Sequence, residues 1–559
     1  MMVSNHIDQR DSTHDGHCSR NGGWLRARSA GGWRWSLGRQ ATIGALSLFA
    51  VMTMLPPAHS VDIPLTEPLP STVYEIELTY VGEQTTPTVA LSGPPEAVPP
   101  LLYRPFVPIL ELQPGFGDAR LFGLCEGQKT NTQQGIALQW GAGEGVRCGQ
   151  RVALHGDGAP IDLLSYERLR IRGRATGQVV VALEDVAGSR REDNLPLGMV
   201  SGPFDITVSL KDIGRRLDLR QLTTLVVSTE GGSAHILVEQ LQVTQRQPEA
   251  MRQAGIGFWV WNYRAAVRDP DTVLSTCRAQ GCSRVFIQMP SQADDEALWS
   301  EYVRLLTQLH EAGVEAMALD GYPEAIQEPH KLADKIQRLL QIMKPGALFG
   351  VQLDIEPYVL PGFLKNEAQL RRYLETIETA KEVIAGRTRL SMVIPFWLAS
   401  PTIAGRPLAY AVMDRVDEVA VMSYRTDMDE LQDIAQDILR YGDLTGTPVW
   451  LAVETTPLPL ERHVVLRTET QAPRVEALLD YDRRLLQWAP VSAVQTAPPR
   501  QGWFRIHHQY AVRPERLTFA GRSRAEVTAA VETLLNDNSH PSFAGMIIHD
   551  LDGFRALKE

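Results

Sequence analysis

The sequence predicts an all-β sandwich over residues 106–247 followed by a (β/α)8 barrel over residues 248–559. Eight apolar runs lie after Val243, each followed by a helical pattern, and eight strand–helix alternations over roughly 300 residues is the count of such a barrel. Before Val243, helical periodicity is almost absent and short alternating runs recur between turn signals. A chain of 559 residues with 44% hydrophobic content is long enough for both parts.

The first sixty residues predict a targeting leader. Arginines precede an apolar run from Thr42 to Leu55, and small residues follow around Ala58-His59-Ser60. We expect cleavage near residue 60 and export to the periplasm or medium. The apolar run is shorter than the ~20 residues that span a bilayer, so no integral span is expected after cleavage.

Residues 61–105 are rich in Pro, Thr and Ser around one strand, Tyr74–Val81, and predict a linker with a strand attached. The net charge of −11 argues against nucleic acid as a partner. Of the five cysteines, Cys18 leaves with the leader and four remain: Cys125, Cys148, Cys277 and Cys282. An even number in an exported chain predicts disulfides, most simply one in each half of the chain.

In the sandwich, Leu169 and Ile171 alternate with polar residues, which suits a sheet with one face in water. The expected strands are Ile136–Gln139, Arg168–Gly173, Gln178–Leu183, Phe204–Ser209, Thr224–Ser228 and His235–Val243. The passage LLSYERLRIRGRATGQVVVALED resembles the jelly-roll carbohydrate-binding modules that accompany secreted glycosidases. That resemblance implies a jelly-roll fold and either sugar binding or a purely structural role.

The apolar runs assigned to the barrel are Ile256–Trp261, Arg284–Met289, Glu315–Leu319, Phe349–Leu353, Leu390–Pro395, Glu418–Tyr424, Val449–Val453 and Gly545–His549. Helix signals lie between them, such as Pro270 before and Gly281 after the first helix. After the seventh run comes a long irregular passage, about Thr455–Gly521, with one helix-like segment near Ala472–Gln487. Such an insertion can form a wall over the catalytic face of a barrel.

The fourth run ends in FGVQLDIEPY, where Asp354 and Glu356 are separated by one residue and therefore face the same way. Pro357 ends the ladder, so both carboxylates lie where catalysis is sought in a barrel. The other strand ends are acidic and aromatic: Trp259, Trp261, Asn262, Gln288, Asp320, Trp397, Tyr424, Asp427, Glu454, His549, Asp550 and Asp552. Glycoside hydrolysis needs two carboxyl groups, and flat apolar side chains stack on sugar rings.

Other barrel chemistries do not fit these residues. A metal-dependent amidohydrolase would need His-x-His on the first strand, which reads Phe258-Trp259-Val260-Trp261. A Schiff-base aldolase needs a lysine inside the barrel, and every lysine after Gly255 falls on a predicted helix, loop or terminus. We therefore expect a glycan substrate and neither a metal nor another cofactor.

Two sets of residues resemble known glycosidase motifs. Leu353-Asp354-Ile355-Glu356 resembles the end of the D-x-x-D-x-D-x-E motif of family 18 glycoside hydrolases, the chitinase-like barrels, and Met422-Ser423-Tyr424 resembles their M-x-Y motif. This resemblance implies that Glu356 is the acid, that Asp354 orients the substrate's acetamido group and that Tyr424 helps to hold it. Phe349 and Gln352 stand where the family has its first two aspartates, and His549 where a tryptophan is common.

The second resemblance is to clan A retaining glycosidases. Glu356-Pro357 is similar to their acid/base position after strand four, and Leu451-Ala452-Val453-Glu454-Thr455 to their nucleophile at the end of strand seven, although Ile355 replaces the usual Asn. It implies a retaining double displacement with Glu454 as nucleophile, the mechanism expected here by a small margin over the chitinase-like one.

Several roles stay open at this stage. Glu454 is a nucleophile or the partner of an arginine, Asp320 a substrate ligand or the cap of the turn at Gly321, and only one of Trp259 and Trp261 reaches the sugar. The remaining residues expected at the substrate are Tyr424, Trp397, Asn262, Tyr358, Gln288 and His549. The alternatives to a glycosidase are a glycan-binding or scaffold protein with a degenerate barrel and a polysaccharide deacetylase-type hydrolase.

Overall fold

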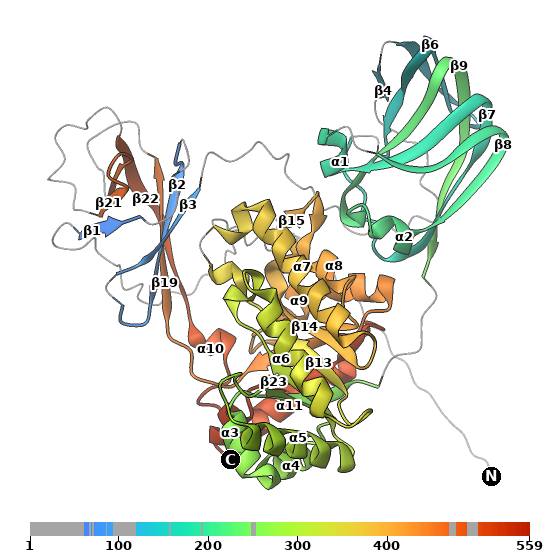
Figure 1. Ribbon diagram of the computed structural model, residues 1–559. Coiled ribbons are helices and arrows are strands. Elements are labelled where there is room, and N and C mark those ends of the chain that lie inside the picture. The colour runs from blue at the N-terminus through green and yellow to red at the C-terminus, as the bar shows by residue number, and fades with distance from the viewer. Residues whose placement is uncertain are drawn as a thin grey trace, which may run out of the picture.

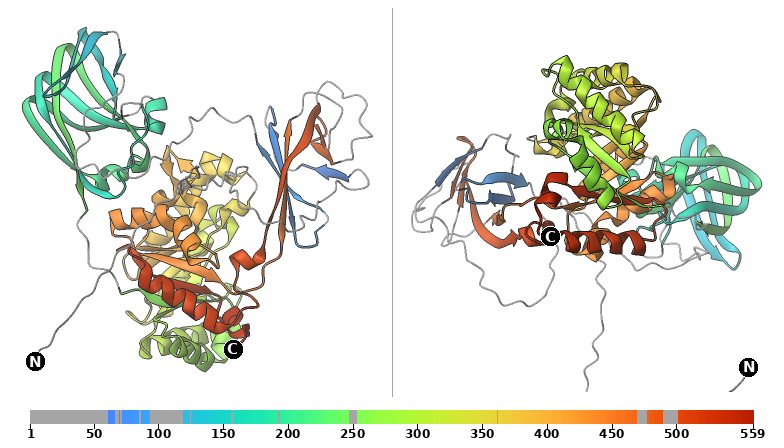
Figure 2. Two further views of the ribbon diagram at one scale, coloured as in Figure 1. Left: turned by 180° about the vertical axis from the view of Figure 1, so that it is seen from behind. Right: turned by 90° about the horizontal axis from the view of Figure 1, so that it is seen from below.

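The computed structural model describes residues 61–559 except 66–68, 70–71, 85, 93–118, 124, 156–157, 192–193, 247–252, 361, 469–476 and 489–500. The expected leader lies outside the described residues. The described chain forms a central barrel with a β-sheet part on each side (Figures 1 and 2). No helix in the described part of the chain has both the length and the hydropathy needed to cross a bilayer.

The central part is a closed barrel of eight parallel strands, as the alternating runs predict. The strands, in their order around the barrel, are β10 (Gly255–Val260), β11 (Arg284–Gln288), β12 (Glu315–Asp320), β13 (Gly350–Leu353), β14 (Arg389–Pro395), β17 (Glu418–Met422), β18 (Val449–Glu454) and β23 (Phe543–His549). First and last strands pair in parallel, with Phe258 opposite Ile548, and this pairing closes the barrel. The sequence predicted each strand to within two residues.

Helices cover the outside of the barrel. They are α3 (Tyr263–Arg268), α4 (Pro270–Ala279), α5 (Glu296–Glu311), α6 (Pro329–Ile342), α7 (Glu367–Ile384), α8 (Leu408–Met413), α9 (Met428–Thr445), α10 (Pro514–Leu517), α11 (Arg524–Asp537) and α12 (Leu551–Ala556). Pro270 begins α4 and Asp269 caps it, as the sequence signals indicate. Four 3₁₀ turns, η2 (Pro323–Ile326), η3 (Pro357–Val359), η4 (Phe363–Lys365) and η5 (Phe396–Ala399), and the short strands β15 (Thr402–Ile403) and β16 (Arg406–Pro407) lie in the connections.

Alternate residues of the barrel strands point inward and fill the interior with packed side chains, because successive side chains of a strand face opposite ways. The buried interior cluster consists of Trp259, Phe286, Met317, Leu319, Val393, Ala420, Trp450, Ala452 and Ile547. At the N-terminal end of the barrel, Arg284 and Glu418 form a buried ion pair of 2.7 Å. The same alternation places Gln352, Asp354 and Glu356 on the interior side, toward the C-terminal end of the barrel.

An antiparallel six-stranded sheet forms the part shown in cyan and green in Figure 1. Its strands are β4 (Ala119–Phe122), β5 (Cys125–Thr132), β6 (Gly135–Ala153), β7 (Tyr166–Asp185), β8 (Leu195–Ser209) and β9 (Leu222–Gln245), with α1 (Val186–Arg191), α2 (Leu210–Gly214) and η1 (Leu219–Gln221) between them. Pairs of the short strands that the sequence predicts join into single long ones: Arg168–Gly173 and Gln178–Leu183 both lie in β7. A register shift between Ala175 and Val179 in the pairing with β8 separates them.

Charged side chains fix this sheet to the barrel's helices. Arg220 of η1 lies 2.5 Å from Asp437 of α9, and Arg440 of α9 makes two hydrogen bonds of 2.8 and 2.9 Å to Asp162. Planar guanidinium–carboxylate pairs of this kind hold two surfaces in a defined orientation.

The third part corrects two expectations. The described residues between 61 and 92 form three strands and not one: β1 (Val61–Pro64), β2 (Glu75–Val81) and β3 (Thr88–Ser92). The passage after the seventh barrel strand contributes β19 (Glu461–Thr468), β20 (Ala477–Asp480), β21 (Leu485–Trp488) and β22 (Gln501–Val512). All seven strands form one sheet in the order β1-β21-β20-β22-β19-β2-β3. The helix expected near Ala472–Gln487 is wrong over residues 477–487, where β20 and β21 form a hairpin, and its first residues, 472–476, lie outside the described residues.

One of the two expected disulfides is present in the described structure. Cys277, in α4, is bonded to Cys282, just before β11. The pairing expected in the first half of the chain stays a prediction.

Candidate active site

Asp354 and Glu356 follow β13 on its interior side, where the sequence places them. Both are partly exposed, whereas Leu353 and Ile355 between and beside them are buried among the helices. The backbone N–H of Asp354 donates to the carbonyl of Asp320 on the neighbouring strand, at 2.9 Å. A Cβ atom at Gly321 would lie 1.9 Å from the carbonyl oxygen of Asp354, so only glycine permits this close approach of the two strand ends.

The Asp354 carboxyl keeps its proton up to near neutral pH. Burial and the neighbouring charge of Glu356 raise the pKa of Asp354 to about 7, and His549 opposes them in part. Oδ1 of Asp354 is buried and accepts no hydrogen bond from the part of the chain that the structure describes. A buried, unpartnered carboxyl oxygen beside a second carboxylate is typical of catalytic acid–base pairs.

Glu356 is held by an aromatic pair. The Tyr358 hydroxyl donates a hydrogen bond of 2.5 Å to Oε1 of Glu356, and the Tyr358 ring packs edge-on against Trp397, with ring centroids 4.8 Å apart. Burial and the charge of Glu356 raise the pKa of Tyr358, so its hydroxyl stays protonated as a donor. The second oxygen of Glu356 is thereby left to act on another group.

Glu454, at the end of β18, is 2% exposed and both of its oxygens are engaged. Oε1 accepts hydrogen bonds from the backbone N–H and the hydroxyl of Thr456, at 2.6 and 2.7 Å. Oε2 lies 2.7 Å from Nδ1 of His549, although not in line with the ring N–H. Glu454 therefore pairs with a histidine, a partner that the sequence did not suggest.

His549 lies between Glu454 and three aromatic side chains. The indole N–H of Trp261 donates to Nε2 of His549 at 2.8 Å. Ring centroids of Trp259, Trp261 and Tyr424 lie 5.7, 6.0 and 5.8 Å from the centroid of His549. Burial lowers the pKa of His549, but the nearby Glu454 carboxylate outweighs burial and leaves this pKa raised.

Tyr424 lies close enough to Glu454 and to the Asp354–Glu356 pair for their charges to act on its hydroxyl. Burial, together with the charges of Glu454, Asp354 and Glu356, raises its pKa well above the usual value, so the hydroxyl remains protonated. Ser423 before it is fixed to β18 by two hydrogen bonds of 3.0 Å with the backbone of Ala452. The structure thus brings together Asp354, Glu356, Tyr424, His549, Glu454 and Trp261 from strands β13, β17, β18, β23 and β10.

Asp320, another residue expected at the substrate, lies elsewhere. It ends β12 on the helix-facing side, because Met317 and Leu319 take the interior positions. Its Oδ2 lies 2.6 Å from Nζ of Lys335 in α6, and Oδ1 accepts the N–H of Gly321. The turn interpretation is therefore the one that these contacts favour, and sequence reasoning missed Lys335.

Trp259 fills the barrel and Trp261 is the partly exposed member of the pair. The Trp259 N–H donates to Oε1 of Gln352 at 2.6 Å, and the Gln352 amide in turn donates to Ser391. Gln352, at a position where the family 18 motif has an aspartate, is thus a buried packing residue.

The remaining strand-end residues mostly begin helices. Asn262 caps α3, Asp427 caps α9 and Asp550 caps α12, each accepting a backbone N–H in the first turn. Gln288 is partly exposed at the end of β11. No group of three or more His, Cys, Asp or Glu side chains in the described ranges is arranged to hold a metal ion.

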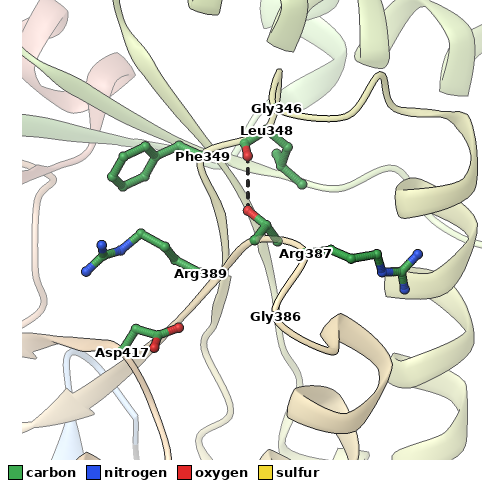
Figure 3. A pocket seen from close by; sticks show the side chains of 8 residues that line it. Gly346, Leu348, Phe349, Gly386, Arg387, Arg389 and Asp417 are labelled. Carbon is green, nitrogen blue, oxygen red and sulfur yellow. Dashed lines mark hydrogen bonds between the residues drawn. The ribbon is translucent and has the colours of Figure 1, made fainter.

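A shallow pocket of about 450 Å³ lies at the opposite, N-terminal end of the barrel (Figure 3). Its lining residues are Gly346, Leu348, Phe349, Gly386, Arg387, Thr388, Arg389 and Asp417. The Thr388 hydroxyl donates to the Leu348 carbonyl across it. The ends of barrel strands that carry catalysis are the C-terminal ones, so we do not place the active site here.

Comparison with known proteins leaves the family open. No protein-family model and no curated protein matches the chain. It is similar in part to solved structures of a chitinase from Chromobacterium violaceum ATCC 12472 (11% identity, 54% of this chain and 97% of that chain, TM-score 0.30) and a chitinase from Bacteroides thetaiotaomicron (10%, 54% and 91%, 0.32). A third is the Bacillus cereus spore cortex-lytic enzyme SleL (10%, 57% and 76%, 0.31). Similarity this low carries no argument about activity.

Proposed function

We propose that this protein is an exported glycoside hydrolase whose general acid is Glu356. One observation carries the proposal. Asp354 and Glu356 lie side by side at the catalytic end of β13, and the pair retains a proton up to about pH 7, because the pKa of Asp354 is raised to about 7.

In the proposed reaction, the carboxyl pair supplies the proton. The pair's one proton is on Glu356 at the moment of reaction, and Glu356 passes it to the glycosidic oxygen as a nucleophile bonds to the anomeric carbon and the C1–O bond breaks. Water later displaces that nucleophile from the anomeric carbon and gives one proton back to Glu356. Before the transfer, sharing this one proton keeps two full negative charges from building up in one buried place. The Tyr358 hydroxyl orients Glu356 throughout.

The contacts of Glu454 favour the chitinase-like variant over double displacement. A nucleophilic carboxylate needs one oxygen free to approach the anomeric carbon, and both oxygens of Glu454 are engaged, by Thr456 and His549. In the chitinase-like variant, the substrate's own 2-acetamido oxygen is the nucleophile, and Asp354 with its unpartnered Oδ1 would hold that group. We therefore propose a 2-acetamido sugar at the cleaved bond and overall retention.

The test is a panel of glycans analysed by product mass, with Glu356→Gln as the decisive variant. An acid role requires turnover to fall by at least ~10²-fold with binding retained. Glu367→Gln, an exposed glutamate in the first turn of α7, is the matched control and should keep full activity. Undiminished hydrolysis by Glu356→Gln refutes the assignment.

Two other outcomes would replace the proposal. A product that loses acetyl groups at unchanged chain length would make the protein a deacetylase-type hydrolase. Binding without any product would make it a glycan-binding protein with an inactive barrel.

Export is tested separately. The N-terminal sequence of the protein recovered from a periplasmic extract or the medium should begin near residue 60. Recovery of the full chain from the cytoplasm would refute export.

A further inference from the structure

Trp261 at the mouth of the barrel is held by a chain of polar contacts that starts two strands away. Thr456 donates twice to Glu454, Glu454 lies against Nδ1 of His549, and Nε2 of His549 accepts the indole N–H of Trp261. Every link between heavy atoms is 2.6–2.8 Å. Trp261 is partly exposed, whereas Glu454, near the other end of this series of contacts, is 2% exposed.

The direction of each donor fixes the state of the histidine. An indole nitrogen only donates, so Nε2 of His549 must be the bare, accepting nitrogen. The ring proton then sits on Nδ1, on the side of the Glu454 carboxylate. Glu454 thereby selects the one neutral tautomer of His549 that can accept the Trp261 hydrogen bond.

We propose that Glu454 and His549 are positioning residues that fix Trp261 as the stacking wall for a sugar ring beside Asp354 and Glu356. This inference rests on the proposed function, since it assigns the sugar ring to that mouth. It gives Glu454 a role other than attack on the anomeric carbon. Flat indole faces pack on the apolar faces of sugar rings, and a fixed ring loses less entropy on binding than a mobile one.

Glu454→Gln is a sharp test because Thr456 dictates how the amide must sit. The backbone N–H of Thr456 can only donate, so the amide oxygen takes the position of Oε1. The amide NH₂ then faces Nδ1 of His549 and forces that nitrogen to accept. Nε2 becomes protonated and confronts the indole N–H, donor against donor, so Trp261 is released.

The first measurement needs no ligand. In protein labelled with 5-fluorotryptophan, Trp261→Phe identifies the ¹⁹F resonance of Trp261, and Glu454→Gln should shift and broaden that resonance. The matched control is Glu418→Gln, a second buried glutamate of the barrel strands, which is paired with Arg284 at the opposite end. Glu418→Gln should leave the resonance in place. The spectra are recorded as a series of increasing alkaline pH, because the raised pKa of His549 means that the neutral ring is reached only above its usual range.

The second measurement is binding of a glycan from the panel in the Glu356→Gln background, where turnover does not interfere. Glu454→Gln and Trp261→Phe should each weaken binding roughly 3- to 10-fold, the size of one stacking contact. The double variant should bind no more weakly than Trp261→Phe alone, because Glu454 acts through Trp261.

The outcomes separate this inference from the proposed function. Glycan binding with the non-additive pattern but no hydrolysis by the natural chain would refute the glycosidase proposal and support the positioning role. An unmoved Trp261 resonance, or additive losses in the double variant, would overturn the positioning role whether or not hydrolysis occurs. Loss of turnover by Glu454→Gln that azide or formate restores would also overturn it, since rescue by an external nucleophile identifies Glu454 as the nucleophile.

Discussion

Replacing Asp354 by Asn should stabilise the protein at neutral and alkaline pH. The folded-state pKa of Asp354 is about 7 against an ordinary value of 3.8. Between these two pH values the folded protein binds one more proton at this site than the unfolded chain does, so the free energy of unfolding falls as pH rises. A difference of roughly three pKa units corresponds to about 4 kcal/mol by pH 7, and Asn does not incur this cost because it has no charge.

The assay is urea unfolding followed by tryptophan fluorescence, for the natural chain and Asp354→Asn between about pH 4 and 8. Near pH 4 the two should unfold alike, because the carboxyl and the amide are both neutral and of similar shape. Asp354→Asn should gain up to ~4 kcal/mol by pH 7 while losing hydrolysis. A stability gain that does not change with pH would refute the raised pKa.

Glu356→Gln provides an internal control for this prediction. The charge of Glu356 is the second cause of the raised pKa of Asp354, after burial. In the Glu356→Gln background the pKa of Asp354 should fall, and the stabilisation by Asp354→Asn should shrink accordingly. An unchanged gain would mean that the two carboxyl groups do not interact.

Three further predictions concern residues outside the acid pair. Lys335→Ala leaves the buried carboxylate of Asp320 without its ion-pair partner and should lower the free energy of unfolding, measured in urea, by about 3–5 kcal/mol. The value of kcat/KM should not change. Weaker substrate binding by this variant would mean that Asp320 contributes to the active site after all. Gln352→Leu removes the acceptor of the Trp259 N–H and should cost ~1–3 kcal/mol, so an unchanged unfolding midpoint would contradict that contact. Burial lowers the pKa of His463 in β19, but adjacent carboxylates outweigh burial and raise this pKa to about 9. The protonated ring should therefore stabilise the fold fully below pH 6.5, and this stabilisation should vanish as pH rises through 9. His463→Gln should abolish this pH dependence in thermal melts.

The barrel was predictable from the sequence because its strands are short apolar runs, and such runs in a parallel sheet are buried on both faces. The same property hides which way a residue points. In Glu315–Asp320 the apolar residues occupy both faces, so nothing in the sequence indicates that Asp320 turns toward α6. After β13, in contrast, the two polar residues Asp354 and Glu356 are separated by one apolar residue, and this spacing predicts that both side chains point the same way.

The pairing of Glu454 with His549 could not be read from the sequence. The two residues are 95 positions apart, on strands β18 and β23, and become neighbours only through the closed strand order. Their register places Glu454 directly opposite His549. A histidine at the end of the eighth strand was visible, but its partner depended on that register.

The missed hairpin β20–β21 has a local cause. Leu478, Leu479, Leu485 and Leu486 fit a helical repeat as well as a strand pattern. What decides the structure is a turn: the Asp480 carboxylate accepts the backbone N–H groups of Asp482 and Arg483, and Arg484 adopts a φ of 51°. Aspartate turns of this kind compete with helix formation. Here the turn is favoured because the residues on either side of it pair with strands far away in the sequence, β20 with β22 and β21 with β1.

The seven-stranded sheet constrains how this protein can be made and divided. Strand β2 is hydrogen-bonded along its length to β19, with Leu78 opposite Val464, and β19 is bonded in turn to β22. During synthesis, β2 leaves the ribosome long before its partner and must wait through the emergence of the whole six-stranded sheet and most of the barrel. A shortened chain that begins at the barrel would retain β19 without β2 and expose an open strand edge, a known template for aggregation. The barrel is therefore best isolated together with residues 61–92, supplied either in the same chain or as a second fragment.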